Sequence, residues 1–104
     1  MDQSHFVDAI QNKKMVRLTF ISKENGQKLI RTCAPMDFGP RRLAQNQSDR
    51  YHLWDFESDH RHHILSLLPE RIVDMEILGD EFSPDEFVSW PTNWFVKRDW
   101  GKYS

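Results

Sequence analysis

The chain has little cysteine and no long apolar run. Its one cysteine, Cys33, leaves no partner for an intrachain disulfide, whereas small secreted domains usually carry an even set of cysteines. No stretch approaches the roughly 20 consecutive apolar residues that span a bilayer. The opening residues, MDQSHFVDAIQNKK, have neither the basic start nor the apolar segment of a signal peptide. We therefore expect a cytoplasmic protein with no membrane partner.

An excess of charge of one sign is also missing. Fourteen Lys and Arg residues against sixteen Asp and Glu residues give a formal net charge of −2. This balance argues against a protein that coats nucleic acid by bulk electrostatics. A local basic patch is compatible with it, and the alternative is solvated charge scattered over the surface. The candidates for such a patch are Lys13, Lys14, Arg17, Arg41, Arg42 and Arg50.

Catalytic motifs are absent from the sequence as well. Ser, His and Asp residues occur, but none stands in a nucleophile elbow, a phosphate-binding loop or a pair of carboxylates. Cys33 lies within a predicted strand and is most simply a small buried hydrophobic residue. We expect no enzyme and no cofactor.

The N-terminal half predicts a helix followed by a hairpin. Residues 4–14 place Phe6, Val7 and Ile10 on one face of a short helix. Residues 15–22 alternate between apolar and polar, and Asn25-Gly26 before the return strand at 28–33 is a strong hairpin signal. Residues 35–49 are irregular, with at most a short strand near 36–38 or 42–43.

The second half predicts three more strands and a tail. Residues 51–56 are apolar on both faces, which is typical of an interior strand, and 62–68 return from it. Pro69 marks a corner. Residues 72–78 then form a strand with Val73, Met75 and Ile77 facing inward. Ser83-Pro84-Asp85-Glu86 has the pattern of a helix start.

Together these segments predict a mainly β (α+β) fold. It is a small SH3-like or Sm-like antiparallel barrel of about five strands, with an N-terminal helix and a short helical C-terminal tail. We expect residues 1–82 to form the barrel and residues 83–104 to pack on it, as one domain of 104 residues.

The order of motifs from about residue 6 to residue 82 resembles the WYL domain, a small barrel of prokaryotic transcription regulators. The matching segments are Ala9-Ile10, Asn25-Gly26, Arg31 with Pro35, Tyr51-His52-Leu53, Glu70-Arg71-Ile72 and Phe82. Tyr51 and His52 stand where the family has Trp and Tyr. The helix-turn-helix domain that usually precedes the barrel has no room here. The resemblance therefore implies a stand-alone regulatory or sensor domain.

The same resemblance implies a ligand site. In the family, basic and aromatic residues of the barrel are thought to bind a ligand or a nucleic-acid fragment. The matching residues are Arg31, Tyr51, His52 and Arg71. Arg would hold a phosphate or carboxylate, while Tyr and His would stack on a base. We expect a small anionic ligand, a nucleotide or single-stranded nucleic acid. The alternative is that Arg31 and Arg71 pair with acidic residues at corners of the barrel.

Two further clusters have alternative interpretations. His60, His62 and His63, with Asp59, suggest a metal site, but a structural site needs about four ligands and we expect none. The tail carries Trp90, Trp94, Phe95 and Trp100, which either complete the core or bind a protein partner or a second copy. A protein-interaction module without ligand, acting through this tail or an exposed strand, is the alternative function.

Overall fold

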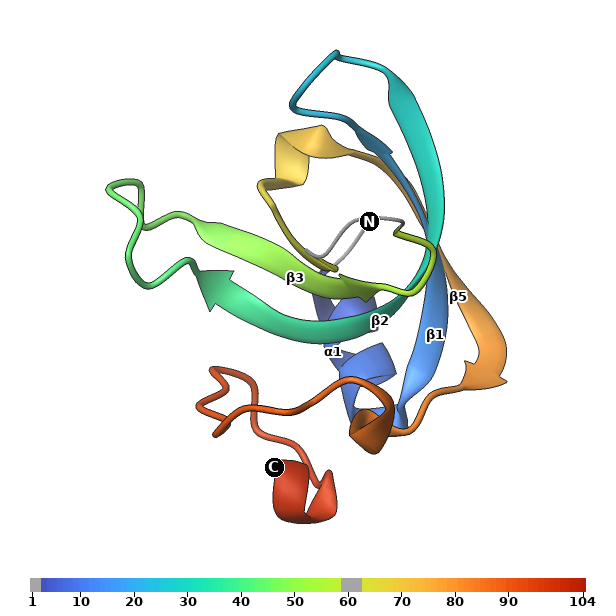
Figure 1. Cartoon of the computed structure of the whole chain (residues 1–104), viewed down its shortest axis with the longest axis vertical. Helices are drawn as coiled ribbons and strands as arrows, with labels where there is room; N and C mark the ends of the chain where they lie inside the picture. Colours follow the sequence, from blue (N-terminus) through green and yellow to red (C-terminus); the bar gives the residue numbers. More distant parts are fainter. Residues whose placement is uncertain (1–2, 59–62) are drawn as a thin grey trace.

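Five antiparallel strands form one strongly curled sheet in the order β4-β3-β2-β1-β5. A computed structural model describes residues 3–58 and 63–104. The elements are α1 (Gln3–Asn12), β1 (Lys14–Ile21), β2 (Lys28–Pro40), β3 (Asp49–Asp55), β4 (Ile64–Leu67), η1 (Pro69–Arg71), β5 (Ile72–Glu81), η2 (Pro84–Glu86) and η3 (Gly101–Tyr103). Figure 1 shows the strands curving around the centre of the molecule. The prediction of a mainly β, barrel-like fold with an N-terminal helix is confirmed.

The predicted hairpin is present, and its second strand is longer than expected. Val16, Leu18 and Phe20 of β1 are buried, as the alternation requires. At the turn, the Asn25 side chain accepts a hydrogen bond from the Gln27 amide at 3.1 Å. The strand β2 then continues through the segment predicted to be irregular and ends at residue 40. Residues 28–33 of β2 pair with β1 and residues 33–40 pair with β3, so one long strand joins the two halves of the sheet.

The prediction for β5 is wrong for two of its three inward residues. Met75 is buried, but Val73 is 48% exposed and Ile77 is 39% exposed. Thr19 pairs with Asp74 and Phe20 pairs with Ile72, so a bulge leaves Val73 without a partner on β1. Ile77 lies opposite Val16, on the edge strand of the sheet.

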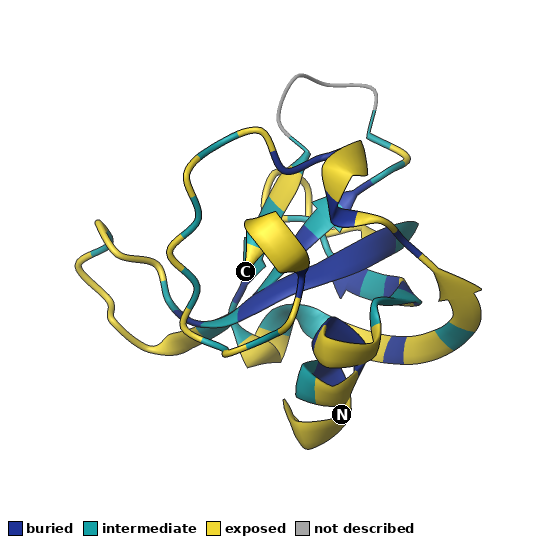
Figure 2. Ribbon diagram, turned by 90° about the horizontal axis from the view of Figure 1, so that it is seen from below, coloured by how far each residue is buried: buried dark blue, intermediate teal, exposed yellow. Residues whose placement is uncertain are grey.

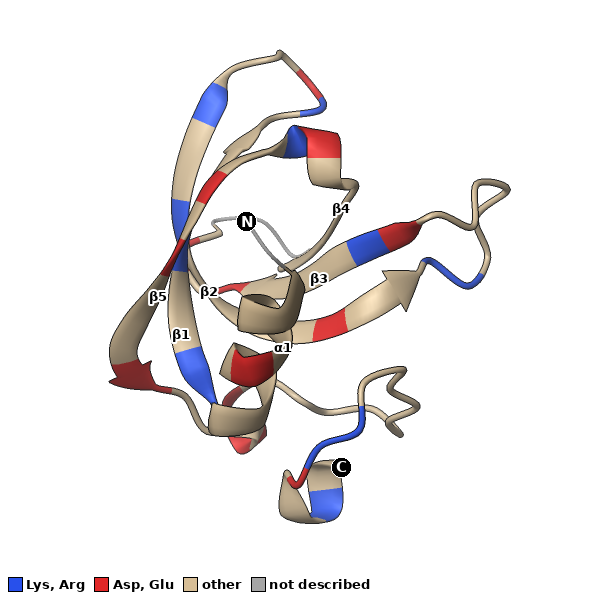
Figure 3. Cartoon of the chain, turned by 180° about the vertical axis from the view of Figure 1, so that it is seen from behind, with Lys and Arg blue, Asp and Glu red and all other residues tan. Residues whose placement is uncertain are grey.

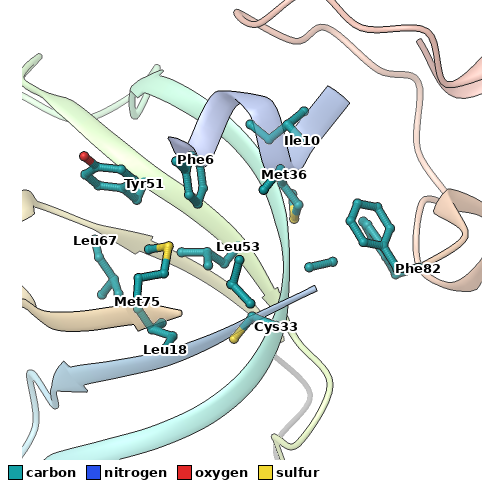
Figure 4. Packing of buried hydrophobic residues seen from close by; sticks show 14 of the residues in the cluster. Phe6, Ile10, Leu18, Cys33, Met36, Tyr51, Leu53, Leu67, Met75 and Phe82 are labelled. Atoms are coloured by element: carbon teal, nitrogen blue, oxygen red, sulfur yellow. The ribbon is translucent and has the colours of Figure 1, made fainter. Parts of the chain in front are cut away.

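The core lies between α1 and the concave face of the sheet. Phe6, Ala9 and Ile10 are the buried residues of α1, whereas Val7 of the predicted apolar stripe is only half-buried. Figure 4 shows Phe6 beside Tyr51, with Leu53 in the same cluster. Phe6 and Tyr51 meet edge to face, with ring centroids 4.8 Å apart.

The tail, residues 83–104, lies beside β2 and α1 (Figure 1), and its Phe87 stacks on Trp54 of β3. Trp100 is buried, and its indole N–H donates to the carbonyl of Ile10 at 2.9 Å. A Cβ placed on Gly39 would lie 2.5 Å from the Phe95 ring, so the tail approaches the β2 backbone closely. Figure 2 shows buried residues along the middle of the sheet and an exposed loop after β2. Within residues 3–58 and 63–104, no helix is long and apolar enough to cross a membrane.

Candidate anion-binding site

The face of β3 that points away from the core carries polar side chains of this strand. Tyr51, Leu53 and Asp55 point inward and are buried, which leaves Arg50, His52 and Trp54 on the other face. The tail covers part of this face, because Trp54 stacks on Phe87 with centroids 5.3 Å apart. Arg50 and His52 lie further along the same face, and both are half-buried. Ser66 of β4 is the cross-strand neighbour of His52 there.

Four cationic side chains from four segments line one pocket of about 430 Å³, which we call the basic pocket. Lys23 comes from the β1–β2 turn, Arg41 from the loop after β2, Arg50 from β3 and Arg71 from η1. No Asp or Glu is among the lining residues. The others are Ile64, Ser66, Leu67 and Leu68. Figure 3 shows the basic residues of the loop after β2, of the start of β3 and of η1.

Arg50 has an unsatisfied donor in this pocket. Its Nη1 donates to the carbonyl of Ser66 at 3.3 Å. Its Nε is buried and has no hydrogen-bond partner. A buried donor without a partner costs about 1–3 kcal/mol. An anion oxygen that reached Nε would relieve this cost, and guanidinium groups bind phosphate and carboxylate through several N–H groups at once.

Among residues 3–58 and 63–104, the cations of the basic pocket also have no carboxylate within ion-pair distance. The ion pairs of the described residues are Lys14–Glu81, Arg17–Glu76, Arg31–Asp55 and Arg98–Asp37. None of them includes a lining residue of the pocket. Three acidic residues stand next in sequence to these cations, namely Glu24, Asp49 and Glu70. None of them lines the basic pocket, although Glu70 lines an adjoining pocket together with Lys23 and Arg71. Positive charge is therefore concentrated on the described lining of this pocket, although the whole chain is slightly acidic.

A second pocket of about 370 Å³ adjoins the first and has an aromatic wall. We call it the tail pocket, because Trp90, Trp94 and Phe95 of the tail line it together with His52. Both pockets share two lining residues, which are Arg41 and Ser66. Arg42 holds the tail in place here. Its Nη2 donates to the carbonyl of Asn93 at 2.6 Å, and its guanidinium lies 3.9 Å from the centroid of Phe95.

Two of the four predicted ligand residues line these pockets. His52 lines the tail pocket, and Arg71 lines the basic pocket, where its Nη1 also lies 3.4 Å from the carbonyl of Ile21. The other two lie elsewhere. Arg31 Nε is 3.5 Å from Asp55 Oδ2, which is the structural pairing that the sequence left as an alternative.

Tyr51 lines neither the basic pocket nor the tail pocket, but a separate pocket of about 240 Å³ beside β5. Its side chain faces inward and is 6% exposed, because it occupies an inward position of β3. Its ring lies edge to face with both Phe6 and Phe38. The structure therefore brings His52 and Arg71 to the two adjoining pockets and places Arg31 and Tyr51 outside them.

The residues that sequence reasoning missed are Lys23, Ser66 and the role of Arg50. In the sequence, Arg41 and Arg50 are candidates only for a local basic patch, to which scattered surface charge is the alternative. A signal for Arg50 existed, because it stands two positions before His52 and must share its face of the strand. No sequence signal brings Lys23 to the same place, since it lies on the far end of another hairpin.

The other candidate chemistries find no support in the described residues. His60, His62 and Asp59 of the histidine cluster lie outside them, and His63 stacks on Trp54 at 4.9 Å. Within the described part of the chain, no three His, Cys, Asp or Glu side chains gather as a metal site. Burial raises the pKa of the Cys33 thiol, with the charges of Asp55 and Glu57 acting in the same direction. The thiolate form is thereby disfavoured.

The comparisons with known proteins leave the site to be judged on its geometry. No family model, no curated protein and no solved structure matches this chain.

Proposed function

We propose that the protein is a WYL-like sensor domain that binds a phosphate-bearing ligand of the nucleotide type in the basic pocket. The ligand is a free nucleotide or a segment of single-stranded nucleic acid. The observation that carries the proposal is the set of four cations around one pocket that have no carboxylate partner in the described part of the chain, with Arg50 Nε buried and unsatisfied.

The chemistry of the two pockets suits the two parts of a nucleotide. Arg50 and Arg71 offer planar donor groups for phosphate oxygens, and Lys23 adds a point charge. The tail pocket offers aromatic surfaces next to them, from His52, Trp90 and Phe95. Stacking of a base on such a side chain contributes about 1–3 kcal/mol and tolerates any base.

The first test is the binding of octathymidylate, with thymidine monophosphate and inorganic phosphate as smaller probes. Arg41→Glu reverses one charge in the basic pocket, at an exposed position that carries no packing. We expect it to weaken octathymidylate binding at least about tenfold, since a close charge pair at a binding surface contributes about 1.5 kcal/mol or more. The matched control is Arg17→Glu, which makes the same reversal on β1, away from the pocket.

The measurements are fluorescence anisotropy of labelled octathymidylate and amide shift mapping by NMR. Affinity is expected to fall with salt, with a slope of about 0.7 for each phosphate contacted. Tight binding of thymidine monophosphate would favour a free nucleotide, and binding of the longer probe alone would favour a nucleic-acid segment. If none of the probes shifts Arg50, His52 or Arg71, or if Arg17→Glu weakens binding as much as Arg41→Glu, the proposal fails.

A second candidate function is association of two copies through the edge strand β5. The observation that favours it is the exposure of Val73 and Ile77 on a strand that pairs on one side only. Sedimentation velocity over a range of concentrations tests it. A dimer that Ile77→Lys abolishes would support this function, and a monomer at all concentrations would exclude it. The Trp-rich tail is a weaker candidate surface, because its four large aromatic residues already contact the rest of the chain.

A further inference from the structure

The two hydrogen bonds of His52 fix where its protons lie. Its Nε2 is 2.8 Å from the carbonyl oxygen of Gly39 and its Nδ1 is 2.9 Å from the Ser66 hydroxyl. A carbonyl oxygen can only accept, so Nε2 must carry a proton. In a neutral imidazole the other nitrogen then has none. Nδ1 must accept, and the Ser66 hydroxyl must donate to it.

This arrangement affects the basic pocket, because Ser66 lines it. With neutral His52, the single hydroxyl proton of Ser66 is used by the imidazole, and the hydroxyl has only lone pairs to offer an anion. With protonated His52, Nδ1 donates instead, and the Ser66 oxygen accepts. The hydroxyl proton is then free to point to an oxygen of a bound anion.

We propose that His52 sets the anion affinity of the basic pocket through Ser66, so that binding of a phosphodiester takes up one proton at His52. This inference rests on the proposed function and names a further ligand-contacting residue, Ser66, and the positioning residue that controls it. Protonation adds one positive charge beside the pocket and one donor inside it.

The charged groups around His52 agree with a proton that arrives together with an anion. From β2, Asp37 is its cross-strand neighbour, but the Asp37 carboxylate already accepts from the amides of Phe95 and Val96 and pairs with Arg98. The other charged side chains that line the two pockets are all cationic, namely Lys23, Arg41, Arg42, Arg50 and Arg71. The tail contributes no titratable side chain to the tail pocket. A bound phosphodiester would place its negative charge among these cations, next to His52.

The test compares octathymidylate binding at pH 8 and pH 5.5 in the wild type, His52→Gln and Ser66→Ala. Phosphodiesters keep their charge over this range, so the probe itself does not titrate. We expect wild-type affinity to rise by about 5- to 20-fold at the lower pH, in line with one added charge-assisted hydrogen bond. Both variants should lose most of this rise, because Gln cannot become charged and Ala offers no hydroxyl. His63→Gln is the matched control and should keep the rise, since His63 stacks on Trp54 and lines neither pocket.

Proton uptake gives a second readout that does not depend on the variants folding. Calorimetry of the wild type near pH 7, in two buffers of different ionisation enthalpy, should show net uptake on binding. Binding without uptake, equal affinity at both pH values, or an undiminished rise in His52→Gln would overturn the inference and leave the proposed function standing. Absence of octathymidylate binding at both pH values would overturn the proposed function itself.

Discussion

Arg98 and Arg50 differ in how completely the folded protein pairs their guanidinium groups. The side chain of Arg98 is completely buried, and each of its three nitrogens has a hydrogen-bond partner. Its Nη2 is 3.2 Å from Asp37 Oδ1, and its guanidinium lies 4.3 and 4.4 Å from the ring centroids of Trp94 and Trp100. Its Nη1 also donates to the carbonyl of Met36, in the bulge of β2. Burial lowers the pKa of Arg98 to about 10, against the pull of Asp37, so the side chain remains charged at neutral pH.

The guanidinium group of Arg50 has far fewer partners than that of Arg98. It is half-buried, with one weak hydrogen bond to a carbonyl, no carboxylate and one buried N–H without a partner. The difference separates two uses of the same residue type. The Arg98 cluster attaches the tail to the sheet, whereas the basic pocket presents cationic hydrogen-bond donors to a ligand. Variants that remove each arginine should therefore affect different properties of the protein.

The largest effect is expected for Arg98→Met. Removing one partner of a buried ion pair costs about 3–5 kcal/mol, because the other charge stays buried. Here the Asp37 carboxylate would lose its cation while it still binds the amides of Phe95 and Val96. Urea denaturation followed by tryptophan fluorescence measures the loss. The control is Arg17→Gln, which breaks an exposed ion pair between β1 and β5. It should change the free energy of unfolding by less than about 0.5 kcal/mol. Equal effects of the two substitutions would refute the contrast drawn above.

A smaller loss is expected where the tail touches the sheet. Gly39→Ala places a methyl group 2.5 Å from the Phe95 ring, and such overpacking costs about 1–3 kcal/mol. The neighbour is a side chain, so shortening it should make room. We expect Gly39→Ala to cost less in a Phe95→Ala background, because Ala lacks the Cδ2 and Cγ atoms that would lie 2.5 and 2.8 Å from the added methyl group. Part of the cost should remain, since the φ of +159° at residue 39 strains any side chain there. A double-mutant cycle by urea denaturation measures the coupling. Additive effects would mean that the tail does not lie on Gly39 in solution.

Arg50→Met sharpens the comparison from the other side. Met keeps much of the side-chain length and removes the unsatisfied donor. The free energy of unfolding should therefore stay within about 1 kcal/mol of the wild type, or rise slightly. Octathymidylate affinity should fall at least about tenfold, since hydrogen bonds to charged groups contribute about 1.5–3 kcal/mol. Denaturation and anisotropy on the same preparation separate the two. A large loss of stability with unchanged affinity would make Arg50 a structural residue.

Local signals in the sequence identified most of the fold. The alternation of Val16, Leu18 and Phe20 and the Asn25-Gly26 turn specify the first hairpin without help from distant residues. The full length of β2 was missed, because Pro35 and Gly39 weaken a strand pattern locally. Pairing with β3 overrides that weakness in the folded protein. Likewise, the bulge at Val73 is a property of two paired strands and leaves no trace in the alternation of one.

The candidate site was only half predictable for a related reason. The basic pocket joins side chains that lie 9 to 48 positions apart, at residues 23, 41, 50 and 71. Only the curl of the sheet brings them together. The sequence identified Arg and His as residue types suited to anions. It could not tell which cation meets a carboxylate, and that difference decides between a structural and a binding arginine. Arg31 meets Asp55 because β2 and β3 pair at Cys33 and Asp55, and Cys33 lies two positions after Arg31 in β2.

The smallest effect is expected for Arg31→Gln. Burial raises the pKa of Asp55 above its usual value, and the charge of Arg31 acts against this rise. The folded protein thus favours protonated Asp55 more than the unfolded chain does. The contribution of Asp55 to stability is most favourable at low pH and declines as pH rises through the raised pKa.

Without Arg31, that pKa should rise further and the decline should extend to higher pH. The variant should match the wild type near pH 3.5 and lose less than about 1 kcal/mol at pH 7, since Arg31 is partly exposed. Urea denaturation from pH 3.5 to 8 measures this difference. A difference that does not change with pH would mean that Arg31 acts through packing and not through Asp55. Octathymidylate affinity should be unchanged, because Arg31 lies outside both pockets; a loss there would return it to the binding site.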